Sequence, residues 1–316
     1  MYNYKIIILF LLMSSCSFCG DQNLVGEYES LDFPENIWLL ESGYINDYPA
    51  TKQGGYLDEE KGAIVDIDLP DSSYRSYWYV EDSVSVFTEP IDEDMSEFRC
   101  CFYDGKKSVK LFDVEETSIG SVSMSKTHDL LAVSIASNNF IEESYDMNFI
   151  HLFKLSDLKD GKKNVRKVSS DLCPHLRIVG DRLYYSKYHD VDADCLGDYG
   201  LYYRDLDDLD KEICVDETFR FSAMSDDGNY VIGSFYPMTD ENQEIRESSP
   251  FVIWNLKENK LAVVAKTGFY KGVYSRRKRC FYIMASEREL YRINIDGEYK
   301  YDRNDSVLYT VSRSGW

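Results

Sequence analysis

Residues 225–232 read SDDGNYVI, a tight turn followed directly by a strand, and this short unit recurs along the chain. Asp, Asn and Gly suit turns because they tolerate unusual backbone angles, whereas Tyr, Val and Ile suit pleated strands. Three further stretches fit the same slot: residues 125–133 (SKTHDLLAV), 179–185 (VGDRLYY) and 275–282 (SRRKRCFY). The chain therefore repeats one turn-and-strand unit.

A second pattern accompanies the first: a long or apolar residue, a bulky residue, a polar residue and an aliphatic residue. Its copies are residues 64–67 (IVDI), 111–114 (LFDV), 152–155 (LFKL), 203–206 (YRDL), 253–256 (IWNL) and 292–295 (RINI). Their last residues lie 47, 41, 51, 50 and 39 positions apart. Short strands with a period of about 40–50 residues are typical of a β-propeller, in which each repeat forms one four-stranded blade.

Together the two patterns resemble those of WD-repeat and TolB-type β-propellers, over about residues 62–297. Residues 290–297 (LYRINIDG) are especially similar to the TolB type. The chain departs from these families because the turns lack the proline of Ser-Pro-Asp-Gly and the WD-type Gly-His pair is missing. The resemblance implies architecture and leaves function open, since propellers host many activities.

We therefore expect an all-β fold, a β-propeller domain over residues 24–316 after a short N-terminal signal helix. Six copies of the second pattern predict six blades. Seven blades are the alternative, if residues 24–60 and 303–316 build an extra one. Residues 306–311 are a candidate for the strand that closes the ring.

The first residues have the layout of an export signal. Lys5 precedes an unbroken apolar run at residues 6–13, and the small residues Ser14 and Ser15 follow. This order is typical of a secretory signal peptide. Such a run rises about 12 Å as a helix, against about 30 Å of hydrocarbon in a bilayer, so it predicts a leader and not a membrane span.

The end of this leader resembles the lipobox of bacterial lipoproteins. The matching residues are 13–16 (MSSC), with Met13 where that family usually has Leu. In the family the cysteine is lipidated and becomes the new N-terminus. The resemblance therefore implies lipidation at Cys16, a signal peptide over residues 1–15 and a lipidated tether over residues 16–23.

The residue after the lipidated cysteine bears on localisation. Ser17 stands where Asp tends to retain Gram-negative lipoproteins at the inner membrane. The resemblance therefore implies an outer-membrane lipoprotein of the cell envelope. An ordinary cut after Cys19 is the alternative and would give a periplasmic or secreted protein.

The charge of the chain excludes one class of partner. The 316 residues include 35 Lys and Arg and 56 Asp and Glu, a net charge of −21. Removing residues 1–15, in which Lys5 is the one charged residue, leaves 34 − 56 = −22. Such a body repels nucleic-acid phosphates and anionic lipid headgroups. We expect no nucleic-acid partner, and membrane contact through the acyl anchor at Cys16.

Six cysteines follow the leader region: Cys100, Cys101, Cys173, Cys195, Cys214 and Cys280. Export makes disulfides permissible, and a bridge between Cys173 and Cys195 would close a loop of roughly 20 residues worth about 3 kcal/mol. Cys100 and Cys101 are adjacent, and on a strand their side chains point to opposite faces, so a bond between them would be strained. We expect both to be buried thiols. No C-x-x-C motif follows the leader, so we expect no zinc or other metal site.

Motifs of catalysis are absent from the sequence. It has no G-x-S-x-G, H-E-x-x-H, G-x-x-x-x-G-K or G-x-G-x-x-G. We therefore name no catalytic residue and no cofactor. His175 opens a predicted inner strand with Arg177 on the same face, and Arg220 and Tyr274 occupy the corresponding strands of the next two blades. These four residues predict a polar pocket in the central channel.

Two charged stretches have competing interpretations. Asp190, Asp192 and Asp194 suggest calcium, but Leu201 stands where an EF-hand needs its bidentate Glu, so a solvated acidic loop is the better interpretation. Residues 205–210 are interpreted in the same way. Residues 276–279 (RRKR) are a basic cluster, either a hairpin tip or a patch for an anionic partner.

We expect a non-catalytic binding or scaffold protein at the bacterial envelope, whose rigid rim meets an envelope protein or a glycan. The 26 tyrosines suit such contacts and suit ordinary strands equally. The alternative is a propeller enzyme, a hydrolase or lyase acting on glycans or peptides, with His175 as acid and Arg177 as charge clamp. A pocket with converging titratable groups would distinguish the enzyme.

Overall fold

The computed structural model describes most of the chain between residues 29 and 295. The described ranges are 29–32, 39–52, 54–66, 75–81, 83–92, 97–115, 119–135, 149–170, 173, 175–188, 199–235, 251–265, 271–284 and 289–295. The predicted signal peptide, tether and Cys16, and the predicted closing strand at 306–311, lie outside these ranges. In the described part, no helix has the length and apolar composition needed to cross a membrane.

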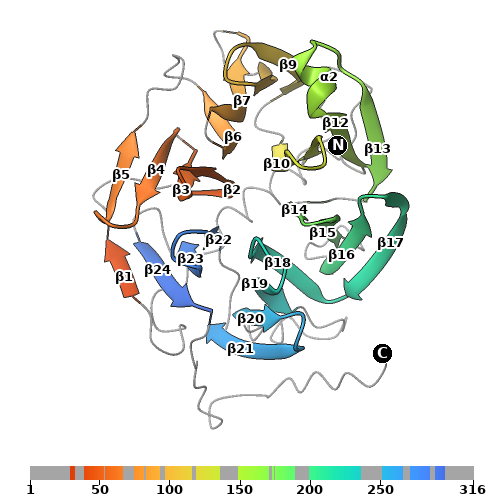
Figure 1. The fold of residues 1–316 in the computed structure, drawn as a ribbon. Helices are drawn as coiled ribbons and strands as arrows, with labels where there is room; N and C mark the ends of the chain where they lie inside the picture. The colour runs from red at the N-terminus through yellow and green to blue at the C-terminus, as the bar shows by residue number, and fades with distance from the viewer. Residues whose placement is uncertain are drawn as a thin grey trace, which may run out of the picture.

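Most described residues belong to β-sheets that surround a common axis, and the described part has one short helix, α2 (Leu155–Lys159) (Figure 1). Three successive sheets have four antiparallel strands each. The first contains β10 (Ile119–Ser125), β11 (Leu130–Ile135), β12 (Phe149–Lys154) and β13 (Val165–Ser169). The second contains β14 (Leu176–Val179), β15 (Arg182–Tyr188), β16 (Tyr199–Asp205) and β17 (Asp208–Asp216). The third contains β18 (Phe219–Met224), β19 (Tyr230–Phe235), β20 (Phe251–Asn255) and β21 (Lys260–Ala265).

The first part of the chain forms one eight-stranded sheet in the order β5-β4-β3-β2-β6-β7-β8-β9. Its strands are β2 (Leu39–Ile45), β3 (Tyr48–Thr51), β4 (Gly55–Asp58), β5 (Ala63–Asp66), β6 (Ser76–Glu81), β7 (Val84–Pro90), β8 (Glu97–Tyr103) and β9 (Ser108–Glu115). Its halves meet where β2 and β6 pair in parallel, at Gly43↔Val80 and Tyr44↔Glu81. Gly43 has φ +155°, and a Cβ there would lie 2.8 Å from the carbonyl oxygen of Val80. The close approach at this seam therefore requires glycine.

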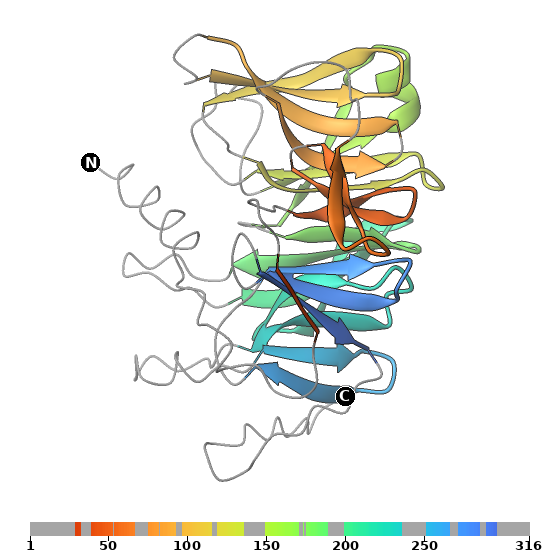
Figure 2. The ribbon, with the colours of Figure 1, turned by 90° about the vertical axis from the view of Figure 1, so that its left-hand side faces the viewer.

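The last sheet joins the two ends of the described chain. It contains β22 (Lys271–Ser275), β23 (Cys280–Met284) and β24 (Glu289–Asn294), and its outer strand is β1 (Glu29–Asp32). β1 pairs antiparallel with β24, and it lies against the blue strands in Figure 2. A strand from the beginning of the chain thus completes the sheet at its end, which closes the ring.

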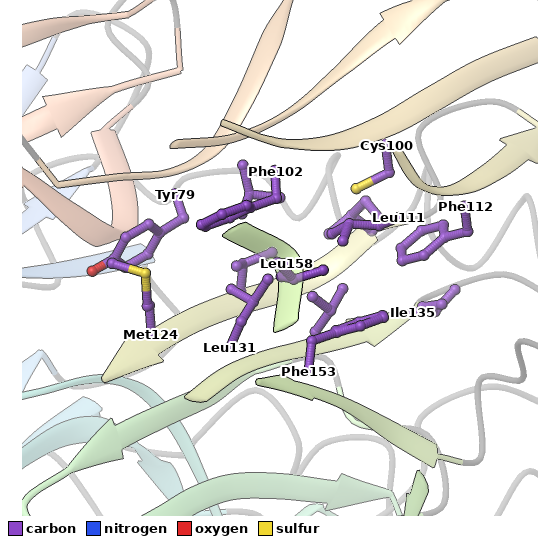
Figure 3. Packing of buried hydrophobic residues seen from close by; sticks show 14 of the residues in the cluster. Tyr79, Cys100, Phe102, Leu111, Phe112, Met124, Leu131, Ile135, Phe153 and Leu158 are labelled. Atoms are coloured by element: carbon purple, nitrogen blue, oxygen red, sulfur yellow. The ribbon is translucent and has the colours of Figure 1, made fainter. Parts of the chain in front are cut away.

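Hydrophobic side chains fill the space between neighbouring sheets (Figure 3). One cluster joins Phe102 of β8 and Leu111 of β9 to Leu131 of β11, Phe153 of β12 and Leu158 of α2, all fully buried. Each such side chain contributes about 1.5–3 kcal/mol of burial free energy. Packing of successive sheets about an axis is the arrangement of a β-propeller, and the predicted propeller fold is confirmed.

The turn-and-strand unit occupies one structural position. Its four copies span the turns that join β10 to β11, β14 to β15, β18 to β19 and β22 to β23, always the first and second strands of a sheet. Three copies begin with a serine whose Oγ accepts a backbone N–H from the turn or from the strand that follows it: Ser125 from His128, Ser225 from Tyr230 and Ser275 from Lys278. Serine at this position therefore stabilises the turn.

The second pattern occupies two positions. Residues 152–155, 203–206, 253–256 and 292–295 coincide with the ends of the third strands β12, β16, β20 and β24. Residues 64–67 and 111–114 coincide with β5 and β9, the two outermost strands of the eight-stranded sheet. The irregular spacing of the pattern thus arises partly from a shift of one strand.

Candidate ligand-binding site

A cavity of about 160 Å³ opens where the innermost strands β2, β6, β10 and β14 end. We call this cavity the channel mouth. Its lining residues are Gly43, Tyr44, Tyr79, Ser123, Met124, Arg177, Ile178, Val179, Gly180, Asp226 and Arg276. Asp226 follows β18 and Arg276 follows β22, so every innermost strand places a residue at the mouth. The ring geometry brings these residues together although they are far apart in sequence.

Arg177 is the buried centre of the site, with 7% of its surface exposed. Its Nη2 lies 2.7 Å from Oδ1 of Asp226 and donates to Oη of Tyr44 at 3.2 Å. The Tyr44 hydroxyl in turn donates to the backbone carbonyl oxygen of Tyr274 at 2.8 Å. A guanidinium can be buried here because two oxygens accept from its Nη2 and Asp226 balances its charge.

Arg276, in the turn between β22 and β23, completes the same network. Its Nε lies 2.5 Å from Oδ2 of Asp226, and its Nη1 lies 3.1 Å from Oε1 of Glu81. Its guanidinium stacks on the ring of Tyr44, 3.8 Å from the ring centre. Glu81 also accepts a short hydrogen bond from the hydroxyl of Tyr79. Two arginines and two carboxylates therefore balance one another around Tyr44.

The pKa values of Tyr44, Tyr79, Glu81 and Arg177 are all shifted away from neutral pH. Burial raises the pKa of Tyr44 to about 12 and that of Tyr79 well above its usual value. Burial would raise the pKa of Glu81, but the Tyr79 hydrogen bond and the charge of Arg276 outweigh it and lower that pKa. Burial opposes the charge of Arg177, yet Tyr44 and Asp226 raise its pKa overall.

A second hollow of about 360 Å³ adjoins the channel mouth and shares Asp226 and Arg276 with it. Its other lining residues are Asp47, Asp227, Tyr274, Arg277 and Arg279. The three aspartates and three arginines of this hollow also balance in charge. Residues 276–279 form the turn between β22 and β23, which confirms the hairpin-tip interpretation of the basic cluster.

The four predicted channel residues divide into two pairs. Arg177 lines the channel mouth, and Tyr274 lines the adjoining hollow and accepts the Tyr44 hydrogen bond through its carbonyl. His175 and Arg220 are 6% and 7% exposed and line neither cavity. The His175 ring packs near Phe221 of the next sheet, with the ring centres 6.0 Å apart.

Four residues of the mouth network were not predicted: Tyr44, Tyr79, Glu81 and Asp226. Asp226 lies inside the SDDGNYVI turn, so its position at a turn was visible but its direction was not. The other three lie on β2 and β6, whose turns carry no copy of the turn-and-strand unit.

The remaining site predictions have mixed outcomes. Cys173 is buried, and its Sγ lies 3.3 Å from the carbonyl oxygen of His175. Its predicted partner Cys195 and the loop with Asp190 lie outside the described residues, so the disulfide stays a prediction. Within the described residues, no group of three or more His, Cys, Asp or Glu side chains is arranged to hold a metal ion. Cys100 and Cys101 are buried thiols, as predicted.

Comparison with known proteins supports the fold. No protein-family model matches the chain, and no curated protein matches it. A gluconolactonase from Xanthomonas campestris is similar in structure, with 11% identity and a TM-score of 0.51, over 86% of this chain and 91% of that one. Apo AztD from Citrobacter koseri has 12% identity and a TM-score of 0.41, over 80% and 78%. Hsv2 from Kluyveromyces lactis has 11% identity and a TM-score of 0.48, over 92% and 80%. The chain is a β-propeller protein, and at these identities the likeness concerns the fold alone.

Proposed function

We infer that this protein is a lipid-anchored β-propeller of the bacterial cell envelope that binds a neutral glycan at its channel mouth without changing it chemically. The observation that carries the proposal is the charge-balanced network of Arg177, Arg276, Asp226 and Glu81 around Tyr44. A charged ligand would have to displace one of these partners. Sugar hydroxyls both donate and accept, so they can bind guanidinium and carboxylate groups while the ion pairs remain.

The directions of the pKa shifts at the channel mouth favour binding over catalysis. A general acid or base works best with a pKa near the working pH. Here the pKa of Tyr44 is raised and that of Glu81 is lowered, so neither group exchanges protons readily near neutrality. His175, the acid of the hydrolase or lyase alternative, lines neither the mouth nor the adjoining hollow.

We propose six blades in this propeller. Four sheets have four strands each, and the eight-stranded sheet counts as two further blades joined at the β2–β6 seam. The turns after β18 and β22 and the ends of β2, β6, β10 and β14 supply one contribution per proposed blade to the mouth.

The proposed localisation of the protein depends on its N-terminal signal peptide. Residues 13–16 (MSSC) support lipidation at Cys16, and Ser17 supports delivery to the outer membrane. Two or three acyl chains would hold the propeller firmly at the membrane surface. Mass spectrometry of the mature N-terminus tests this: a diacylglyceryl Cys16 supports the anchor, whereas an N-terminus at Gly20 would indicate a cut after Cys19.

The binding proposal is tested with an array of neutral and acidic oligosaccharides, followed by titration of the best probe. Arg276→Met should weaken binding at least tenfold, because it removes a lining guanidinium from the mouth. Arg182→Met is a matched control, since Arg182 also stacks on a tyrosine, Tyr203, and pairs with an aspartate, Asp205, away from the channel. Selective binding of acidic probes, or equal losses in the two variants, would contradict the proposal.

The same assay separates binding from catalysis. The bound oligosaccharide should be recovered intact by mass spectrometry after prolonged incubation with the protein. Cleavage or elimination products that appear with the wild-type protein and disappear with Arg177→Met would instead support the enzyme alternative.

A further inference from the structure

A groove of about 990 Å³ lies away from the channel, between the β10–β13 sheet and the β14–β17 sheet. Its lining comes from the β10–β11 turn, the end of β12, helix α2, the start of β13 and the turns of the β14–β17 sheet. The helix forms part of one wall and contributes Asp157. In Figure 1, α2 lies beside β12, at the side of the sheet that faces away from the axis.

Part of the lining of this groove is apolar, and we call this part the apolar strip. Leu152, Phe153 and Leu209 are buried beneath it, and Leu130, Val165 and Leu206 reach it as half-buried side chains. These residues belong to the hydrophobic packing of the two sheets, so the apolar strip is continuous with the core. A partner that covers this strip gains burial free energy at about 25 cal/mol per Å² of apolar surface.

The rim of the groove is acidic. Five aspartates line it: Asp129, Asp157, Asp181, Asp205 and Asp207. Two cations line it as well, Lys154 and Arg166, so with His128 neutral the lining has a net charge of 2 − 5 = −3. A basic partner would therefore meet complementary charge at the rim.

Hydrogen bonds fix several of these carboxylates in place. His128 Nε2 lies 2.9 Å from Oδ1 of Asp181, and this contact bridges the two sheets. Asp129 accepts the backbone N–H of Ser156 at 2.8 Å, and Asp157 accepts from the amide of Asn164 at 3.1 Å. The rim is thus preorganised, which lowers the entropy cost of binding.

We propose that this groove binds an extended segment of a partner polypeptide in which Lys or Arg alternates with aliphatic residues. Successive side chains of an extended segment point to opposite faces, so aliphatic side chains can face the strip while basic side chains reach the rim. A second copy of this chain is a poor occupant because its net charge is −21. The proposal is independent of the glycan site, since the groove and the channel mouth share no lining residue.

Three fluorescent nine-residue peptides serve as probes: alternating Lys-Leu, alternating Lys-Ser and alternating Glu-Leu. Fluorescence anisotropy at low and at 0.5 M salt measures their binding. The Lys-Leu peptide should bind at least tenfold more tightly than either of the others, and salt should weaken it because screening reduces the rim attraction. Equal binding of Lys-Leu and Lys-Ser would mean that the apolar strip plays no part, and would overturn the proposal.

Neighbouring aspartates supply a matched pair of variants. Asp207 lines the groove, whereas the next residue, Asp208, is also exposed and does not line it. Asp207→Asn should weaken Lys-Leu binding about threefold or more, and Asp208→Asn should leave it unchanged. Equal effects would show that the general acidic field of the protein binds the peptide, which would contradict a specific groove.

Two further variants test the strip and separate the two sites. Val165→Thr keeps the shape of the side chain but places a hydroxyl in the apolar strip, and should weaken Lys-Leu binding several-fold. Arg276→Met should not change peptide binding, because Arg276 lies at the channel mouth. Loss of peptide binding in Arg276→Met with full binding in Val165→Thr would place the peptide in the channel and refute the groove.

Discussion

Arg177 and Asp226 form an ion pair of 2.7 Å across 49 positions of sequence, which is close to one structural repeat. Two similar links bridge neighbouring sheets at the same end of the ring. His128 pairs with Asp181 across 53 positions, and Asp226 also pairs with Arg276 across 50. A strand or turn residue of one sheet thus pairs with a turn residue of the next sheet, and at the channel mouth these pairs also form the candidate ligand site.

The Arg177–Asp226 pair should matter more for stability than an exposed pair. Removing one partner of a buried pair costs about 3–5 kcal/mol, but Asp226 has 35% of its side chain exposed. We therefore expect Asp226→Asn to lower the free energy of unfolding by about 2 kcal/mol in urea titrations. Asp205→Asn, which breaks the exposed pair with Arg182, should cost under about 0.5 kcal/mol. Equal losses would mean that burial of Arg177 does not strengthen its pair.

Closure of the ring by β1 predicts sensitivity to proline. Ser30 and Leu31 pair with Tyr291 and Leu290 of β24. The double change Ser30→Pro/Leu31→Pro should destabilise the protein by at least about 2 kcal/mol, because proline lacks the N–H that a sheet ladder needs. It should also promote association through the exposed edge of β24, which light scattering would detect. Ser30→Thr/Leu31→Val is the control that keeps pairing. A monomeric proline variant of unchanged stability would argue against closure by β1.

Tyr44 predicts a loss of stability at alkaline pH. Its pKa is raised from 10.0 to about 12, so the folded state favours the neutral phenol. The stabilisation by Tyr44 is then fully present below pH 10 and is lost as pH rises through about 12. Tyr44→Phe should flatten this part of the stability profile and should cost about 1 kcal/mol at neutral pH through the lost hydrogen bond to the Tyr274 carbonyl. Denaturant titrations from pH 8 to 12 check this, with Tyr230→Phe as the control. An unchanged alkaline slope in Tyr44→Phe would contradict it.

The buried thiols should react slowly in the folded protein. Burial raises the pKa of Cys101 and Cys280 to about 12, and raises that of Cys100 and Cys173 as well. Because the thiolate is the reactive form, iodoacetamide at pH 7.5 should label these four at least tenfold more slowly than in 6 M urea. Peptide mapping by mass spectrometry measures the rates, with the half-buried Cys214 for comparison. A non-reduced map also tests the Cys173–Cys195 bridge.

The sequence patterns predicted the propeller because similar turn residues recur wherever the first strand of a sheet connects to the second. The SDDGNYVI unit therefore located four inner hairpins correctly. The second pattern was less reliable, since residues 64–67 and 111–114 lie on the outermost strands of the eight-stranded sheet and the other copies on the third strands of four-stranded sheets. Any strand that packs between two sheets needs the same apolar and bulky residues, so the pattern cannot distinguish strand positions.

The candidate site could be predicted in part. Alternation along a strand placed His175 and Arg177 on one face, but of these two only Arg177 lines the channel mouth. Asp226 and Glu81 were missed because their role depends on which turns the ring brings together. Which turns lie next to each other depends on closure of the whole ring, so the sequence around Asp226 or Glu81 carries no local pattern that predicts it. The same reasoning explains why Arg276 was recognised as a hairpin-tip residue and not as a channel residue.

The glycine seam between β2 and β6 has a mechanical consequence. Hydrogen bonds join all strands from β5 to β9, so the β2–β5 half and the β6–β9 half of this sheet share one backbone ladder, whereas the other neighbouring sheets meet through side chains. If the ring is strained or begins to melt, it should part at one of those side-chain contacts and keep residues 39–115 together as its longest-lived fragment.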